Sequence, residues 1–388
     1  MTEPIVVAGA GIAGLATAAA LALQGHPVRV FEARREDLAT APGAGISIWP
    51  NALAALDEIG LGDAVRAAGG RITGGAMRWY DGGWLRRPSP ERLVKALGEP
   101  LVVIQRSRLS DILAGALAPG TVSFGTSITG LVATADGVRL ELSDATRVGA
   151  AAVVGADGTR SVVARHLNGR LDDTYAGYTA WRGIARYRLD PELAGETMAP
   201  GFEVGHVPLG DDLTYWFATE RAAEGQRKPE GELAYLQRKL AHWADPIPAV
   251  LAATAPADVL RNDLYDRTPA RQWSRGSMVV VGDAAHPMRP HLGQGGCQAL
   301  EDAAILGRFV RQAADLPSAF AGFAAFRRPR ATGLVRESAL IGRMVNLRPA
   351  LLSAAAIRAT ALVPESILTR HLASVAARSA FVLPPTPT

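Results

Sequence analysis

The chain has 388 residues, of which 41 are Lys or Arg and 37 are Asp or Glu, giving a formal net charge of +4. Hydrophobic residues make up 48%, which is enough for a large buried core and for two lobes. The charged residues form no basic block, so the composition argues against nucleic-acid binding. Cys297 is the only cysteine, which excludes an internal disulfide and fits a reducing cytoplasm.

The first motif in the chain is a glycine-rich turn near the N-terminus. The apolar run IVVA precedes Gly9, Gly11 and Gly14, an alanine-rich segment follows, and Glu32 ends the next apolar run, VRVFE. Glycines in such a strand-turn-helix unit allow a pyrophosphate to approach the backbone, and the acidic side chain can accept hydrogen bonds from ribose hydroxyls. The pattern predicts dinucleotide binding. Residues 4–23 carry almost no charge, but the start lacks a basic segment, and we expect no membrane span.

A second motif, GDAAHPMRPHLGQGGCQALEDAAIL, occupies residues 282–306. The apolar residues 279–281 predict a strand that ends at Asp283, and the prolines at 287 and 290 prevent it from continuing. A helix is expected to begin near Gly296. Its first turn offers unpaired N–H groups and a positive dipole end, which suit an electron-rich group.

A third motif, VVGADGTRSVVARHL at residues 153–167, contains Asp157 after a short apolar strand. In this order and spacing the three motifs resemble the flavin-dependent monooxygenases of the single-component aromatic hydroxylase type, the para-hydroxybenzoate hydroxylase-like enzymes. The resemblance covers roughly residues 1–345. The run GQGGCQALEDA is similar to the branch that contains urate hydroxylases, hydroxybenzoate 6-hydroxylases and zeaxanthin epoxidases.

The resemblance implies a tightly bound FAD and assigns residues to it by position. Asp283 would bind the ribityl chain, Asp157 is associated with both FAD and NAD(P)H, and Arg106 in IQRSRLSDIL would pair with the pyrophosphate. The stretch 42–56 resembles a loop beneath the flavin ring. The remaining cofactor candidates are the ADP-binding Gly9, Gly11, Ala13, Gly14 and Glu32, the adenosine neighbours Arg34 and Ile128, the ring neighbours Gly45 and Ser47, and Pro290, Gly293, Gly295 and Gly296 near the reacting edge.

The expected fold is an α/β Rossmann-like FAD-binding domain interleaved with a second, α+β domain. Residues 1–72, 100–170 and 275–345 would form the first domain, and residues 73–99 and 171–274 the second. In the second domain, runs such as AMRWYDG and LTYWFATE predict an antiparallel sheet that roofs the flavin. Residues 346–388 are expected to form a C-terminal helical cap.

In the resembling family, FAD, NADH or NADPH, and dioxygen hydroxylate an aromatic ring through a flavin hydroperoxide. The sequence shows no metal-ligand cluster and no nucleophile–base arrangement, so we expect the chemistry on the flavin, with Pro290 and Tyr215 as its nearest residues. The substrate-binding candidates are Tyr215, Trp216, His206 and Arg182. Each has a structural alternative in the sheet core or in an ion pair, and His286 is expected to shape the turn after Asp283.

The expected partners are a phenolic or heteroaromatic small molecule and dioxygen, with no nucleic acid, and the protein would be a monomer or homodimer. Two other activities, an epoxidase and an oxidative decarboxylase, use the same flavin machinery. A flavin-binding carrier that does not turn over is a third alternative. The resemblance leaves open NADH against NADPH and the position on the ring that reacts.

Overall fold

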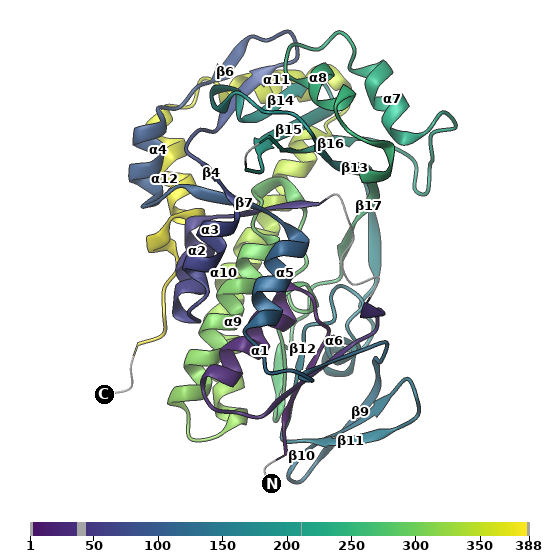
Figure 1. The fold of residues 1–388 in the computed structure, drawn as a ribbon, viewed down its shortest axis with the longest axis vertical. Coiled ribbons are helices and arrows are strands. Elements are labelled where there is room, and N and C mark those ends of the chain that lie inside the picture. Colours follow the sequence, from purple (N-terminus) through teal and green to yellow (C-terminus); the bar gives the residue numbers. More distant parts are fainter. Residues whose placement is uncertain (1–2, 37–43, 211, 386–388) are drawn as a thin grey trace.

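A six-stranded sheet with the order β18-β19-β12-β1-β2-β8 forms the centre of the larger lobe. The computed structural model describes residues 3–36, 44–210 and 212–385, and Figure 1 shows their arrangement. Strands β1 and β12 are entirely buried, because the sheet is covered on both faces. The parallel strands are β1 (Ile5–Ala8), β2 (Val28–Glu32), β8 (Val122–Phe124), β12 (Ala152–Gly155) and β19 (Met278–Val280), and β18 (Ser274–Arg275) pairs antiparallel at the edge.

Helices and a small sheet pack around this centre. Small residues bring α1 and α9 close together, since a Cβ atom at Gly307 of α9 would lie 3.2 Å from the Cβ of Ala20 in α1. The long helix α10 begins at Leu316 and contains Pro329. The helices of this lobe are α1 (Ile12–Leu23), α5 (Arg106–Gly115), α6 (Val162–Asn168), α9 (Gly295–Gln312) and α10 (Leu316–Val345), and the small antiparallel sheet contains β9 (Ile128–Thr134), β10 (Gly137–Leu142) and β11 (Arg147–Ala150).

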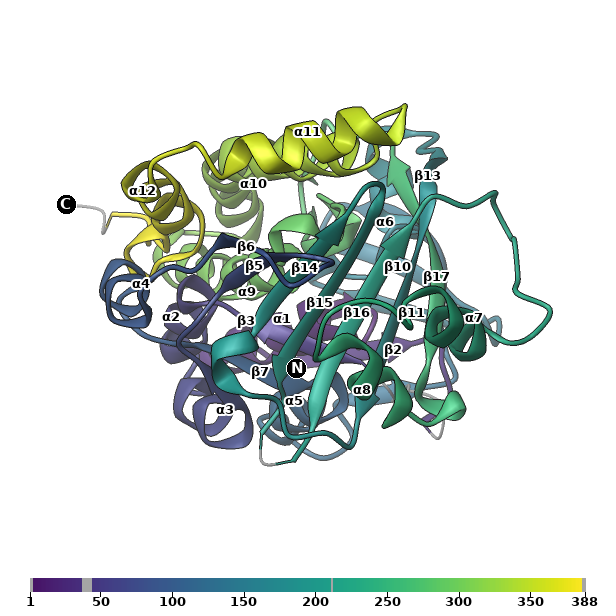
Figure 2. The ribbon, with the colours of Figure 1, turned by 90° about the horizontal axis from the view of Figure 1, so that it is seen from above.

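A seven-stranded sheet, here called the roof sheet, lies above the larger lobe in Figure 1 and is seen from above in Figure 2. Its order is β17-β13-β16-β15-β14-β5-β6. All neighbours are antiparallel except β14 and β5, which are parallel. The strands are β5 (Ala76–Trp79), β6 (Trp84–Arg86), β13 (Asp173–Ala185), β14 (Gly195–Ala199), β15 (Phe202–Pro208), β16 (Thr214–Glu220) and β17 (Leu260–Arg267).

The two faces of the roof sheet have different neighbours. The outer face carries Trp181, Trp216 and Val204, which form a buried cluster with residues of α7 (Glu232–Lys239) and α8 (Ile247–Ala252). The opposite face, here called the under face, packs on the larger lobe through Tyr215, Val103 and their neighbours. The predicted antiparallel sheet above an α/β lobe is therefore confirmed.

A three-stranded sheet with the order β3-β7-β4 lies between the lobes. The stretch 42–56 was expected as a loop, but Gly45–Ile48 forms β3, which pairs antiparallel with β7, and Pro50–Glu58 forms α2; residues 42 and 43 lie outside the described residues. The apolar alternation in GISIW explains the strand. The other elements here are α3 (Gly62–Ala68), β4 (Gly70–Ile72), α4 (Pro90–Leu97) and β7 (Leu101–Gln105).

The long helix α10 runs from the larger lobe to the edge of the roof sheet that carries β5 and β14. Phe320 and Phe323 of α10 pack in the core of the larger lobe, whereas Val345 at its other end packs with Trp79 and Met198 of the roof sheet. The C-terminal helices α11 (Ala350–Thr360) and α12 (Glu365–Ala376) follow, as expected for a helical cap. Over the described ranges no single helix is long and apolar enough to cross a membrane; α11 and α12 meet the length and composition requirement only as a pair bent by 96°.

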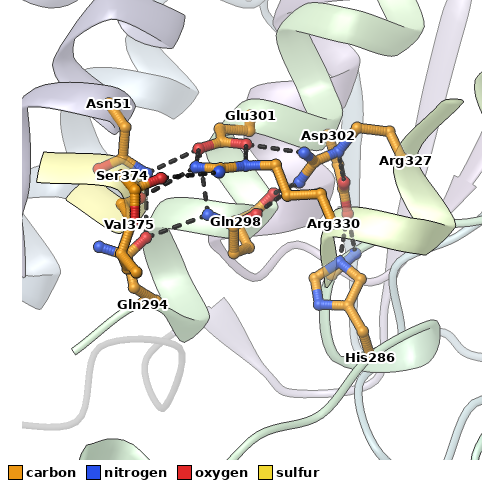
Figure 3. A network of polar contacts seen from close by, with 11 residues as sticks. Asn51, His286, Gln294, Gln298, Glu301, Asp302, Arg327, Arg330, Ser374 and Val375 are labelled. Atoms are coloured by element: carbon orange, nitrogen blue, oxygen red, sulfur yellow. Dashed lines mark hydrogen bonds and ion pairs between the residues drawn. The ribbon is translucent and has the colours of Figure 1, made fainter. Parts of the chain in front are cut away.

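A buried network of charges joins α9, α10 and the turn after β19 (Figure 3). The Arg327 guanidinium donates to Glu301 (Nη1 to Oε2, 2.7 Å) and to Asp302 (Nε to Oδ1, 2.8 Å), and all three side chains are at most 1% exposed. Asp302 Oδ2 also accepts the Gly282 N–H (2.8 Å) and lies 2.6 Å from His286 Nε2. His286 therefore fixes the turn, as the sequence analysis expected. Burial alone would raise the pKa of Asp302, but His286 and Arg327 outweigh it and lower the pKa to about 2.

We predict that Arg327→Met destabilises the protein by roughly 3–5 kcal/mol, because it leaves the buried Asp302 without its guanidinium partner and Glu301 with Arg330 as its remaining cation. Urea unfolding followed by circular dichroism measures the change. Arg336→Met, at an exposed position of the same helix, is the matched control and should behave like the wild type. Equal stability of the two variants would contradict the role given to the network.

Acid should weaken the same network. The folded pKa of Asp302, about 2, lies below its ordinary value of 3.8, so its stabilising contribution is present above about pH 3.8 and is lost as the pH falls towards 2. Unfolding free energies measured in urea between pH 6 and pH 3 should therefore decrease. Asp302→Asn should show a shallower decrease, and an identical slope in the variant would argue against this assignment.

Candidate functional site

The turn between β1 and α1 can be built only with glycines at two of its positions. Gly9 has a φ of +95°, and a Cβ atom there would lie 2.7 Å from the Ala156 carbonyl oxygen. A Cβ atom at Gly14 would lie 1.9 Å from the Gly9 carbonyl oxygen. At Gly11, in contrast, a Cβ atom would meet nothing within 4 Å. The turn is thus closely packed behind and open at Gly11, where the first turn of α1 begins without a side-chain cap.

Glu32, at the end of β2, holds this turn from one side. Its Oε2 accepts the Ala10 N–H (2.7 Å), and its Oε1 accepts the Arg34 N–H (2.9 Å). The Arg34 side chain is 60% exposed, and its Nε lies 3.5 Å from Glu32 Oε1. Because each carboxylate oxygen has two lone pairs, Glu32 can still accept a further hydrogen bond from a ligand hydroxyl.

The other two motifs converge on the same turn. Gly282 has a φ of +57°, and a Cβ atom there would lie 2.7 Å from the Cβ of Ala13. Asp157 lies behind Gly9, and its Oδ2 accepts the Val162 N–H (2.7 Å) at the start of α6. Its Oδ1 is buried without a hydrogen-bond partner among the described residues, and burial raises the pKa of Asp157. One oxygen of Asp157 is therefore structural, and the other is available to a ligand or a water.

Arg106 and Asp283 carry opposite charges that lie near each other. The Arg106 N–H donates to the Ala44 carbonyl at the start of β3 (2.9 Å). Its side chain is exposed, yet its pKa is lowered, chiefly because the surrounding protein desolvates it, against the opposing attraction of Asp283. The Asp283 side chain is also exposed and has no hydrogen-bond partner in the described ranges.

These features fit the FAD that the sequence resemblance implies. The open Gly11 and the first turn of α1 match a pyrophosphate, Arg106 is a suitable counter-ion for it, and Glu32 and Asp283 offer free acceptor positions for ribose and ribityl hydroxyls. Ile128 differs from these residues because its side chain does not face the site. Its side chain is buried in the core of the larger lobe, so only its backbone could face a nucleotide.

The segment β3 and the start of α9 pack tightly against each other. A Cβ atom at Gly296 would lie 2.6 Å from Ile46 Cδ1, and one at Gly293, whose φ is +61°, would lie 2.9 Å from Trp49 Nε1. The Cys297 thiol donates to the Ser47 carbonyl (3.4 Å). Burial raises the pKa of Cys297 to about 12, so it is a packing group and not a reactive thiol. The turn at 290–292 and Gly295 lie in the same short approach to α9.

Two of the predicted substrate residues, Tyr215 and Arg182, lie on the under face. A Cβ atom at Gly45 would be only 2.4 Å from Tyr215 Cγ, so the tyrosine ring lies directly on β3. Arg182 is opposite Phe217 in the register of β13 and β16, next to the pair Ile184 and Tyr215. Burial raises the pKa of Tyr215, while Arg182 and Arg106 act in the opposite direction. Tyr215, Arg182 and Arg106 are therefore close neighbours.

The other two predicted substrate residues need correction, because Trp216 and His206 lie on the outer face. Trp216 is fully buried with residues of α7 and α8, and its indole N–H donates to Thr254 Oγ1 (2.9 Å). His206 is opposite Trp216, is 1% exposed and lies 3.1 Å from Thr197 Oγ1; burial lowers its pKa to about 4. Adjacent residues of a strand point to opposite faces, so Tyr215 and Trp216 cannot both face one ligand.

The sequence analysis missed a buried polar chain beside Pro290. Tyr178 Oη lies 2.8 Å from His291 Nε2, and His291 Nδ1 lies 3.3 Å from Glu203 Oε2. Strand alternation in FEVGHVP would have placed Glu203 on the face opposite to His206. The pairing with His291 comes from a distant segment and has no local signal.

The comparisons with known proteins agree with this geometry. The sequence matches the family described as "FAD binding domain" over residues 2–338. It is 38% identical over 343 residues to the aurachin C monooxygenase/isomerase of Stigmatella aurantiaca, covering 88% of this chain and 89% of that protein. It is 31% identical over 341 residues to an FAD-dependent urate hydroxylase of Klebsiella pneumoniae, covering 86% and 88%.

A solved structure supports the same relation. The fold matches that of a Klebsiella pneumoniae protein crystallised with FAD and uric acid, with a TM-score of 0.89, 27% identity and coverage of 96% of both chains. The match over most of the chain, in both sequence and structure, is decisive for the family. The chain belongs to the FAD-dependent monooxygenases that carry this FAD-binding domain.

Proposed function

We propose that this enzyme uses NADH or NADPH and dioxygen to hydroxylate a phenolic or heteroaromatic ring held between the under face of the roof sheet and the flavin. The observation that carries the proposal is the contact between Tyr215 and Gly45, which brings the under face directly onto the strand expected beneath the flavin ring. The named activities of the relatives also support it, since they include an aromatic hydroxylase, 3-amino-4-hydroxybenzoate 2-monooxygenase of Streptomyces cremeus, at 35% identity.

FAD, when bound, supplies the redox chemistry with NAD(P)H and dioxygen. The residues of the chain would bind and orient FAD and the substrate and shield them from water. Arg106 would neutralise the pyrophosphate, Asp283 would accept the ribityl hydroxyls, and Glu32 would accept a ribose hydroxyl. Asp157 is the candidate for contact with both FAD and NAD(P)H, through its free Oδ1.

The start of α9 is the part of the site that would stabilise negative charge on the flavin. Its first turn, at Gly295 and Gly296, would lie near the pyrimidine edge of the ring, where unpaired N–H groups and the positive end of the dipole stabilise negative charge. Pro290 and Gly293 shape the approach to this turn. Above it, Tyr215 and Phe217 would exclude water from the reacting face, and Arg182 would close the side near Arg106.

The proposed activity is tested by following NAD(P)H oxidation by the purified holoenzyme with a panel of phenols and heteroaromatic rings. We predict that one class of ring accelerates the oxidation sharply and gains one oxygen atom, as measured by mass spectrometry with labelled dioxygen. A product oxidised at an alkene would point to an epoxidase, and release of carbon dioxide to an oxidative decarboxylase. A flavin that NAD(P)H never bleaches, with or without ligands, would refute the enzyme assignment in favour of a carrier.

We predict that Asp283→Ala loses FAD, because the ribityl hydroxyls lose their acceptor at a cost of about 1–3 kcal/mol for each unmatched group. The ratio of flavin absorbance to protein absorbance after gel filtration measures the loss. Asp283→Asn, which keeps one acceptor oxygen, should retain more flavin. Glu32→Ala should weaken binding less than Asp283→Ala, and full flavin occupancy in Asp283→Ala would rule out the assigned role.

A further inference from the structure

The under face carries a second carboxylate, Glu196, that the site described so far does not use. Glu196 lies in β14, opposite Gly205 of β15 and Met77 of β5. Glu203 is opposite Met198, two residues along β14, so Glu196 and Glu203 are diagonal neighbours on the same face, typically about 7–8 Å apart at Cα. Figure 2 shows β14, β15 and β16 side by side in this part of the sheet.

Among the described residues, no lysine or arginine forms an ion pair with Glu196 or Glu203. Glu203 is 3% exposed and is held by Thr219 Oγ1 (3.3 Å) and by His291, whose Nδ1 lies 3.3 Å away. Glu196 is only partly accessible, and within the described ranges its carboxylate has no hydrogen bond and no ion pair. Burial, together with the charge of Glu203, raises the pKa of Glu196 to about 8. A desolvated carboxyl group without a partner is unfavourable unless a ligand satisfies it.

The neighbours of Glu196 have the composition of a ring-binding wall. Gly205 has no side chain, and the Phe217 ring lies over it, so that a Cβ atom there would be 2.0 Å from Phe217 Cε1. The aromatic ring of Phe217 therefore lies beside Glu196 on the under face. The arginines of the neighbouring strands are engaged elsewhere: Arg86 of β6, opposite Met77, donates to the Thr360 and Val363 carbonyls, and Arg182 of β13 donates to Asn262 (3.2 Å).

The position relative to the reacting edge follows from His291. This residue comes directly after Pro290 and contacts Glu203 and Tyr178 of the roof sheet. The carboxylate pair is thereby linked to the turn that leads into α9, where the flavin edge is expected. A ring that stacks on Phe217 would have one polar edge towards Glu196 and its opposite side towards this turn.

Resting on the proposed function, we propose that Glu196, backed by Glu203, accepts a hydrogen bond from a ring nitrogen, so that the substrate is a nitrogen-bearing ring with an N–H or protonated nitrogen. Glu196 is mainly protonated at neutral pH when nothing is bound, and a ring N–H or protonated nitrogen beside it favours its ionised form, which only accepts hydrogen bonds. The negative charge of Glu203 disfavours an anionic ligand at the same place. Rings that carry a carboxylate are accordingly poor substrates. When an analogue without the N–H binds, the carboxyl group of Glu196 is left without a hydrogen-bond donor. An unpaired buried polar group of this kind makes a site discriminate strongly against the analogue.

The test compares rings of equal shape on the holoenzyme. Binding of 4-hydroxyquinoline, which presents a ring N–H as its keto tautomer, is measured against 1-naphthol and 1-naphthoate through the change in the flavin absorbance spectrum. The wild type should bind 4-hydroxyquinoline at least about tenfold more tightly than 1-naphthol and should bind 1-naphthoate most weakly. Equal affinity for the first two, or preference for the naphthoate, would overturn the inference without any variant.

Substitutions then assign the preference to Glu196. Glu196→Leu should bring the affinities for 4-hydroxyquinoline and 1-naphthol to within about twofold of each other. Glu196→Gln, whose amide oxygen still accepts an N–H, should keep part of the preference. Glu192→Leu, at an exposed position in the short helical turn before β14, is the matched control and should keep all of it.

The outcomes separate the two proposals. Unchanged discrimination in a flavin-loaded Glu196→Leu would refute the role of Glu196 while leaving the hydroxylase intact. If no ring of the panel altered the flavin spectrum or stimulated NAD(P)H oxidation, the proposed function itself would fail, and the inference with it.

Discussion

The buried guanidinium of Arg327 is the interaction on which the geometry of the site depends. Together with Arg330, it neutralises two consecutive carboxylates of α9, Glu301 and Asp302, in a part of the protein where water cannot do so. Asp302 also accepts the Gly282 N–H and contacts His286, and these contacts hold the turn that exposes Asp283. Arg327 and Arg330 of α10 therefore fix the position of α9, and Arg327 also fixes the turn before it through Asp302.

The aspartates of this region differ in role, because they differ in burial and in hydrogen bonding. Asp302 is buried and fully engaged by protein groups, whereas Asp283 is exposed and has no hydrogen-bond partner in the described part of the chain. Asp157 is intermediate, with one oxygen bound to the backbone of α6 and one free. The engaged groups are structural, and the free ones face the region where a nucleotide is expected. The same reasoning singles out Glu196 among the carboxylates of the roof sheet.

The local motifs were sufficient to predict the larger lobe. Three segments have backbone or charge requirements that only particular residues meet: the glycine turn with Glu32, the Asp157 segment and the Gly282–Asp283 turn. Together they predict the α/β class, the parallel sheet and the end of the sheet where a nucleotide is expected. The roof sheet was predicted as a class of structure but not side chain by side chain. Trp216 and His206 were chosen for their aromatic character, although alternation along β15 and β16 sends them to the outer face. Glu203 and His291 meet only because distant segments pack together, and no local pattern encodes that contact.

The helix α10 has a mechanical consequence. It has 30 residues, and at about 1.5 Å per residue it is a rod of roughly 45 Å. One end is embedded in the core of the larger lobe by Phe320 and Phe323, and the other is clamped to the roof sheet by Val345. A helix that is packed into both lobes opposes a hinge motion that would move the lobes apart. Entry of a substrate and exit of a product must then rely on local movement of loops and side chains at the rim, within a frame that keeps its shape.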